Sequence, residues 1–161
     1  MRTTVRCLAL LVALASVAGF GRLSSEAHVA AAADHPSFAG SWTSASPREE
    51  LRITQDASRI TVGRTRGRVE DALVYRLDGS ESRNESRTVT GEKWTHVSRA
   101  RWVGAALVVT TTTTRESTGR SWDWMTTYFV TSDGQLSVAT LDGVLTSDQA
   151  MDLRTTVFGK Q

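Results

Sequence analysis

The fold of this chain is decided by residues 94–114, WTHVSRARWVGAALVVTTTTT. The first part of this stretch, 94–102, alternates between two sets of side chains, and the second part, 107–114, is branched at Cβ almost throughout. Side chains of a strand point alternately to opposite faces, and β-branched residues fit a pleated surface well. Gly104 separates the two parts. The stretch therefore predicts two long antiparallel strands joined by a short turn.

Shorter runs of the same kind continue on both sides of this stretch, separated by turns that recur roughly every dozen residues. The expected strands are 51–55, 59–62, 73–77, 87–90, 94–102, 107–114, 121–130, 136–140 and 154–158. The pattern predicts an all-β fold, in which an up-and-down antiparallel meander closes into a barrel of about 8–10 strands. Helix chemistry appears only in the capping-box pattern at 146–149, so at most one short helix is expected, near 147–153.

Alternation along the strands sorts their aromatic side chains onto one face. Four of the five tryptophans fall on two strands, 94–102 and 121–130. On the first of these strands, Arg99 and Arg101 occupy the opposite face and mark it as outward. In a closed barrel, tryptophans from two such strands converge across the interior. The side chains that we predict to line this interior, as a candidate ligand site, are Tyr75, Trp94, His96, Trp102, Trp122, Trp124 and Tyr128.

Three roles for these aromatics stay open from the sequence. They can line a cavity for a small apolar or aromatic ligand, with His96 as a polar anchor. They can instead fill the barrel and leave no space. On the later strand, Trp122, Trp124 and Tyr128 can also face outward as a platform for a carbohydrate or a protein. This requires Met125 and Phe129 to face the core. The ligand-binding barrel is the leading hypothesis, and a surface-recognition module with a filled barrel is the alternative.

The sequence shows little pattern for catalysis or for metal binding. His96 is the one histidine on an expected strand, and a metal site needs several ligands at set spacings. Nucleophilic catalysis needs a base beside a hydroxyl group, and Ser98 lies two residues from His96, too far along a strand for a good hydrogen bond. We therefore predict no enzyme activity, no catalytic residue, no metal and no cofactor. A haem-binding barrel is a less favoured alternative.

The sequence resembles a known class of barrel proteins at several points. The opening Phe38-Ala-Gly-Ser-Trp42 resembles the Gly-x-Trp start of lipocalin-type barrels. The stretches L-x-I-x-Q at 51–55, Y-x-L-D-G at 75–79 and A-x-W-x-G-x-x-L-x-V-T-T at 100–111 resemble the small exported lipocalin-like proteins of bacteria, most of which have no assigned ligand. The turn at 130–134 departs from their pattern, because it has Val and Thr where Leu and Ser are usual. The resemblance implies a lipocalin-like barrel.

The same resemblance implies how the barrel is closed at its base. In lipocalins the opening tryptophan packs under an arginine from a late strand. Trp42 and Arg154 are the residues at the corresponding places of this chain. We therefore expect them to form a cation–π pair with a structural role.

The first segment of the chain has the form of an export signal. A basic start, with Arg2 and Arg6, precedes an apolar stretch at 7–20 that is too short for a transmembrane helix and the right length for the core of a signal peptide. We predict a signal peptide and frayed N-terminus over 1–33, cleaved within 18–33, and a barrel over 34–161. The product is expected to be periplasmic or extracellular, without stable membrane insertion.

The charge balance argues against a nucleic-acid partner. The chain has 19 Lys and Arg and 17 Asp and Glu, and 1–33 contains three of the basic and one of the acidic residues, so 16 of each remain. A phosphate backbone needs a concentrated basic footprint. The arginines between 59 and 68 are broken by glycines, and we expect them to lie in a solvated loop. The expected partner is a small hydrophobic ligand, and the sequence leaves the oligomeric state undetermined.

Overall fold

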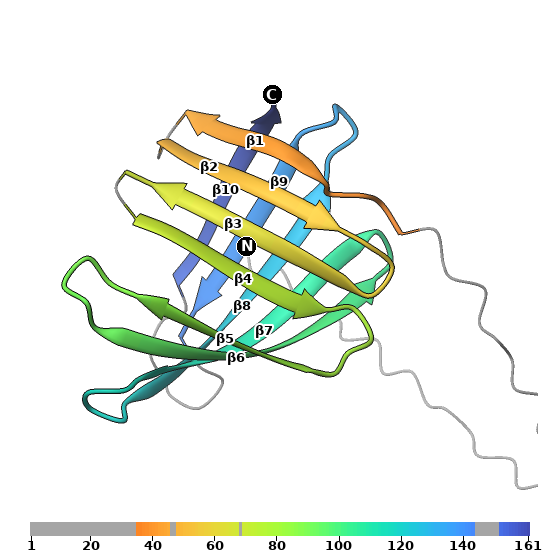
Figure 1. Ribbon diagram of the computed structural model, residues 1–161. Helices are drawn as coiled ribbons and strands as arrows, with labels where there is room; N and C mark the ends of the chain where they lie inside the picture. Colours follow the sequence, from red (N-terminus) through yellow and green to blue (C-terminus); the bar gives the residue numbers. More distant parts are fainter. Residues whose placement is uncertain (1–34, 46–47, 68, 144–151) are drawn as a thin grey trace, which may run out of the picture. The chain divides into compact units, whose positions relative to one another are not determined.

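The computed structural model describes residues 35–45, 48–67, 69–143 and 152–161, and within these ranges the chain forms ten strands and no helix (Figure 1). The strands are β1 (Gly40–Ala45), β2 (Arg48–Gln55), β3 (Arg59–Arg66), β4 (Val69–Arg76), β5 (Glu81–Arg87), β6 (Lys93–Val103), β7 (Ala106–Arg115), β8 (Ser121–Val130), β9 (Leu136–Asp142) and β10 (Asp152–Lys160). The described part of the chain holds no helix long and apolar enough to cross a membrane.

All ten strands belong to one antiparallel sheet. Each strand pairs with the next one along the chain, apart from β4 and β5, and β1 returns to pair with β10. In Figure 1, β1 to β4 cross in front of β7 to β9, so that the sheet wraps around an interior. The predicted all-β meander that closes into a barrel is thus confirmed, with ten strands.

Side chains close the seam between β4 and β5, the two strands at the ends of the sheet. The Asn84 side chain accepts a hydrogen bond from the Val74 N–H at 2.8 Å and donates one to the Val74 carbonyl at 3.0 Å. Nearer the hairpin turn, the Ser82 hydroxyl accepts a hydrogen bond from the Arg76 N–H at 2.8 Å. These bonds satisfy backbone groups that an open sheet edge would offer to another chain.

The position of β5 corrects one expectation. A strand was expected at 87–90, whereas β5 covers 81–87 and the next residues lie in the connection to β6. The sequence of β5, ESRNESR, contains no apolar residue, so hydrophobic alternation could not reveal it. Its inward positions hold Ser82 and Asn84, whose buried side chains bond the backbone of β4 instead of packing in the core.

Two other expectations fall partly or wholly outside the described residues. The helix expected near 147–153 lies mostly in 144–151, and Asp152 and Leu153 already belong to β10. The signal peptide, its cleavage point and the domain boundary at 34 also lie outside the described ranges, and they stay predictions.

Apolar side chains fill one end of the barrel. Phe38 is fully buried and packs on Trp102 and Tyr128, with ring centroids 5.6 Å and 6.4 Å away. The Phe38 N–H donates to the side-chain oxygen of Gln55, and its carbonyl accepts the indole N–H of Trp42, both at 2.9 Å. The segment before β1 therefore closes this end. The buried apolar core comprises Phe38, Trp42, Leu51, Ile53, Ile60, Val62, Tyr75, Ala100, Leu107, Val109, Tyr128, Leu136, Val138 and Phe158.

Candidate ligand cavity in the barrel

The other end of the barrel is hollow. A cavity of about 460 Å³ lies there, between the first residues of β6, β8 and β10 and the last residues of β3, β7 and β9. Ligand cavities for small molecules commonly measure about 300–1,000 Å³. The lining residues are Glu49, Arg64, Trp94, His96, Thr113, Trp122, Trp124, Val138, Thr140, Asp142, Arg154, Thr155, Thr156 and Phe158. The barrel is thus filled at one end and open to a ligand at the other.

Three tryptophans form one wall of the cavity. Trp94 of β6 and Trp122 of β8 meet edge to face, with ring centroids 5.3 Å apart. Strand β7 runs between them, and it places Thr113 directly opposite Trp122 in the sheet register. The indole N–H of Trp124 donates to the Thr113 hydroxyl at 2.8 Å, so this ring is held by a directional bond as well as by packing. The floor beside this wall includes the apolar residues Val138 and Phe158.

A chain of polar groups runs through His96 at the edge of this wall. The Nε2 atom of His96 lies 2.8 Å from the Ser86 hydroxyl oxygen, and its Nδ1 atom lies 2.9 Å from that of Thr113. Thr113 accepts the indole N–H of Trp124, so its own hydroxyl hydrogen is available to donate to Nδ1. The neutral ring can thus accept a hydrogen bond at one nitrogen and donate one at the other. Burial lowers the pKa of His96, and the charge of Asp71 opposes that shift. Near neutral pH His96 is therefore a neutral anchor.

The charged residues of the cavity are unequally satisfied. Arg154 forms ion pairs with Asp142 and, at 3.3 Å, with Asp152. Glu49 is buried and also has an interaction partner. Arg64, by contrast, has no hydrogen bond or ion pair with any residue that the structure describes, although it is partly buried. Among the described side chains, the cavity therefore combines an aromatic wall with the unpaired guanidinium group of Arg64.

The predicted interior residues divide between the cavity and the packed end. Trp94, His96, Trp122 and Trp124 line the cavity. Tyr75, Trp102 and Tyr128 do not: both tyrosines are buried core residues, and Trp102 packs against Phe38 at the closed end. His35 stacks on the outer side of this group, with its ring centroid 4.2 Å from that of Trp102.

The orientation of β8 also decides between two alternatives that the sequence left open. Tyr128 is 2% exposed, whereas its neighbour Phe129 is 36% exposed. Trp122 and Trp124 share the inward face with Tyr128 and line the cavity. The outward aromatic platform that was considered for these three residues is therefore wrong.

The two tyrosines, Tyr75 and Tyr128, belong to the buried core and not to the lining of the cavity. Burial raises the pKa of Tyr75 well above its ordinary value, and the neighbouring Tyr128 adds to the shift. Burial also raises the pKa of Tyr128. Arg64 lowers both pKa values, which places its positive charge within electrostatic reach of the two hydroxyls. The Tyr75 hydroxyl has no hydrogen bond of good geometry in the described structure, although its neighbour is Tyr128.

The expected cation–π pair at the base is wrong in one partner. Trp42 lies at the closed end, but the cation over its ring is the Lys160 ammonium group, 5.6 Å from the ring centroid. Sheet register explains this result, because β1 pairs Trp42 with Lys160. Arg154 lies six residues earlier on β10, about 20 Å away along an extended strand. It belongs to the cavity, where it pairs with Asp142.

Several cavity residues were missed, and a signal for two of them was present in the sequence. Arg64 follows Ile60 and Val62 at a spacing of two, so it shares their inward face. Glu49 precedes Leu51 at the same spacing. The arginines of this region were expected in a solvated loop, yet Arg59 to Arg66 form β3. The strand was expected only at 59–62, and the charge of the later arginines hid the alternation that continues to Arg66.

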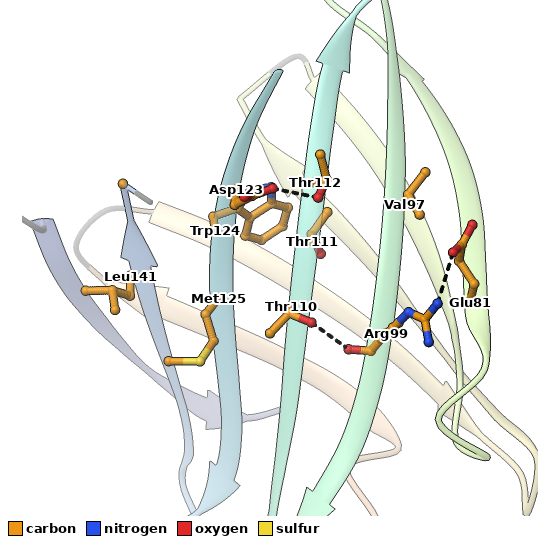
Figure 2. A pocket seen from close by; sticks show the side chains of 11 residues that line it. Glu81, Val97, Arg99, Thr110, Thr111, Thr112, Asp123, Trp124, Met125 and Leu141 are labelled. Carbon is orange, nitrogen blue, oxygen red and sulfur yellow. Dashed lines mark hydrogen bonds and ion pairs between the residues drawn. The ribbon is translucent and has the colours of Figure 1, made fainter. Parts of the chain in front are cut away.

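A second hollow, of about 510 Å³, lies on the outer face of the barrel (Figure 2). Val97 of β6, Met125 of β8 and Leu141 of β9 provide its apolar surface. Figure 2 shows that its polar groups are turned toward one another: Arg99 contacts Glu81 at 3.4 Å, and the Thr112 hydroxyl bonds Asp123 at 2.6 Å. Because these groups satisfy each other, the outer hollow offers fewer free contacts to a ligand than the interior cavity.

The polar groups of the described ranges give little support to catalysis. Ser98 bonds Thr111 at 2.9 Å and not His96, in agreement with the distance argument from the sequence. The hydroxyl that meets His96 belongs to Ser86, and the other ring nitrogen faces the Thr113 hydroxyl where hydrolases place a carboxylate. Within the described ranges, no three His, Cys, Asp or Glu side chains are grouped closely enough to hold a metal ion.

No protein-family model and no curated protein sequence matches this chain. Among solved structures, the chain is similar to the wild-type fluorescent protein UnaG, with a TM-score of 0.52 and 16% sequence identity over 77% of this chain and 97% of UnaG. A point mutant of UnaG gives a TM-score of 0.53, again at 16% identity, over 77% of this chain and 96% of the mutant. At this identity the likeness concerns the fold alone. It supports a β-barrel of a type that proteins of different sequence adopt.

Proposed function

We propose that this chain is an exported lipocalin-like protein that binds a small aromatic or apolar ligand inside its barrel and catalyses no reaction. The observation that carries the proposal is the interior cavity of about 460 Å³ with Trp94, Trp122 and Trp124 in its wall. Cavities that are mostly apolar, with a few polar groups at fixed positions, are typical of small-molecule binding sites. A barrel that only had to be stable would gain from filling this end as it fills the other.

The polar groups of the cavity suit recognition better than reaction. Thr113 holds both His96 and Trp124 by hydrogen bonds, which fixes their orientation before a ligand arrives. Groups that are held in place in the empty protein lose little conformational entropy on binding. With both ring nitrogens bonded to hydroxyl groups, His96 holds its ring in a fixed position beside a ligand whose aromatic part lies against the tryptophans. A role as a fixed anchor agrees with its neutral state.

Native mass spectrometry tests this proposal most directly. The full chain is expressed in a bacterial host, and the protein is recovered from the periplasm or the medium and weighed under native and denaturing conditions. We expect a small-molecule adduct in the native spectrum that is lost on denaturation, and a protein mass that corresponds to cleavage within 18–33. The Trp94→Ala variant should carry less of the adduct, whereas Arg101→Ala, on the outer face of β6, should carry as much as the wild type.

Two results would contradict the proposal. A bare protein mass that no panel of aromatic compounds changes, together with unchanged tryptophan fluorescence, would argue that the cavity binds no ligand. Retention of the uncleaved chain in the cytoplasm would refute export while leaving ligand binding to be judged by the adduct.

A further inference from the structure

We propose that the ligand of the cavity carries an anionic group, such as a carboxylate or a sulfonate, which binds to Arg64 while the aromatic part of the ligand lies against the tryptophans. This inference rests on the proposed function, because it names the chemistry of the ligand in the same cavity. It starts from the position of one side chain. Arg64 lies on β3, opposite Leu51 of β2 in the sheet register, and it shares the inward face with the buried Val62.

The guanidinium group of Arg64 lacks the partners that its burial calls for. Its neighbour across the β3–β4 ladder is Asp71, yet the two side chains form no ion pair within 4.0 Å. No other described residue bonds it. A charged group that is partly withdrawn from water is unfavourable until an opposite charge or a set of acceptors reaches it. Arginine is well suited to this role, because its planar fork can bind a carboxylate or sulfonate through two parallel hydrogen bonds.

Among the side chains that the structure describes, the other cations near the cavity are already paired, which singles out Arg64. Arg154 is bound to Asp142 and Asp152. Arg115, which lies 6.0 Å from the centroid of the Trp94 ring, contacts Glu92 at 3.2 Å. Since these charges are compensated inside the protein, an anionic ligand would gain most from Arg64. The location also fits an amphipathic molecule, because the same cavity has an apolar aromatic wall.

The anionic group can be tested with two probes that share one aromatic body. The dye 1-anilinonaphthalene-8-sulfonate carries a sulfonate, and N-phenyl-1-naphthylamine is the same molecule without it. Fluorescence titration of the wild type should show tighter binding of the sulfonate. In Arg64→Gln, affinity for the sulfonate should fall about 10- to 100-fold, whereas affinity for the neutral probe should change less than about threefold. Raising the salt concentration should weaken only the sulfonate complex of the wild type.

Two further variants keep the test interpretable. Arg52→Gln removes an exposed arginine from the outer face of β2, beside the same ladder, and should bind both probes like the wild type. Arg64→Lys keeps the charge but loses the fork, and should bind the sulfonate with intermediate affinity. Because binding of the neutral probe reports an intact cavity, it also shows whether Arg64→Gln is folded.

The outcomes separate this inference from the proposed function. Equal loss of both probes in Arg64→Gln would assign Arg64 a structural role and overturn the anion site. Equal affinity of the sulfonate for wild type and Arg64→Gln would also overturn it, and would indicate that Asp71 or solvent satisfies the guanidinium group. In both of these cases binding of the neutral probe by the wild type would leave the proposed function standing. Failure of the wild type to bind either probe would reject both.

Discussion

Replacement of Asn84 by alanine removes the side chain that joins β4 to β5. In the wild type this amide makes two hydrogen bonds to the backbone of Val74, at 2.8 Å and 3.0 Å. Each such bond contributes about 0.5–1.5 kcal/mol to stability, and the variant also leaves the Val74 N–H and carbonyl without a protein partner. Val74 is partly exposed, so water can reach these groups in part. We therefore expect Asn84→Ala to lower the free energy of unfolding by about 2–3 kcal/mol.

Urea unfolding, followed by tryptophan fluorescence, measures this loss. With a slope of about 1–3 kcal/mol per molar urea, the midpoint should fall by roughly 0.7–3 M. Ser82→Ala removes one bond of the same seam, to the Arg76 N–H, and should cost about 1 kcal/mol. Arg83→Ala, on the exposed face of β5 between the two residues, is the control and should stay within about 0.5 kcal/mol of the wild type.

Hydrogen exchange at the Val74 amide reports locally on the loss of the Asn84 hydrogen bonds. The Val74 N–H should be protected in the wild type and in Arg83→Ala, and should exchange faster in Asn84→Ala. The reasoning is refuted if Asn84→Ala unfolds at the same urea concentration as Arg83→Ala and the Val74 amide keeps its protection. In that case the seam would be held by packing and not by the Asn84 side chain.

Three further predictions concern the cavity and the closed end. Trp94→Ala should weaken ligand binding with little loss of stability, since this ring is only partly buried, whereas Phe38→Ala should cost about 3–5 kcal/mol in thermal or urea unfolding and leave a destabilised core. Burial lowers the pKa of His96 in the folded protein below 6.5, so as the pH falls the unfolded chain binds this proton first. The free energy of unfolding should therefore fall as the pH drops from about 6.5 toward the folded pKa. His96→Gln should remove this part of the pH dependence, measured by urea unfolding at several pH values. Gly40→Ala should destabilise the barrel by about 1–3 kcal/mol. The reason is that φ is 144° at this position and the new Cβ would lie 3.3 Å from the Lys160 side chain. A free energy of unfolding equal to that of the wild type would contradict this account.

The sequence alone determined the class of fold and the inward face of most strands. Alternation of apolar and polar side chains with a period of two is a local property of one strand, so it can be recognised in the sequence before any partner strand is known. It placed Trp94 and His96 in the interior, and it would have placed Arg64 there as well if its charge had not been taken as a sign of a loop. Export and the absence of catalysis remain predictions from the sequence.

Only the tertiary structure decided which inward residues meet a cavity and which meet the core. Trp94 and Trp102 share one face of β6, yet the first lines the hollow end and the second packs on Phe38 at the closed end. That difference depends on register and on the segment before β1, which are non-local. The pairing of Trp42 with Lys160 has the same origin. The seam at Asn84 is also a tertiary feature, because an isolated polar strand carries no sign of the backbone that its side chains will bond.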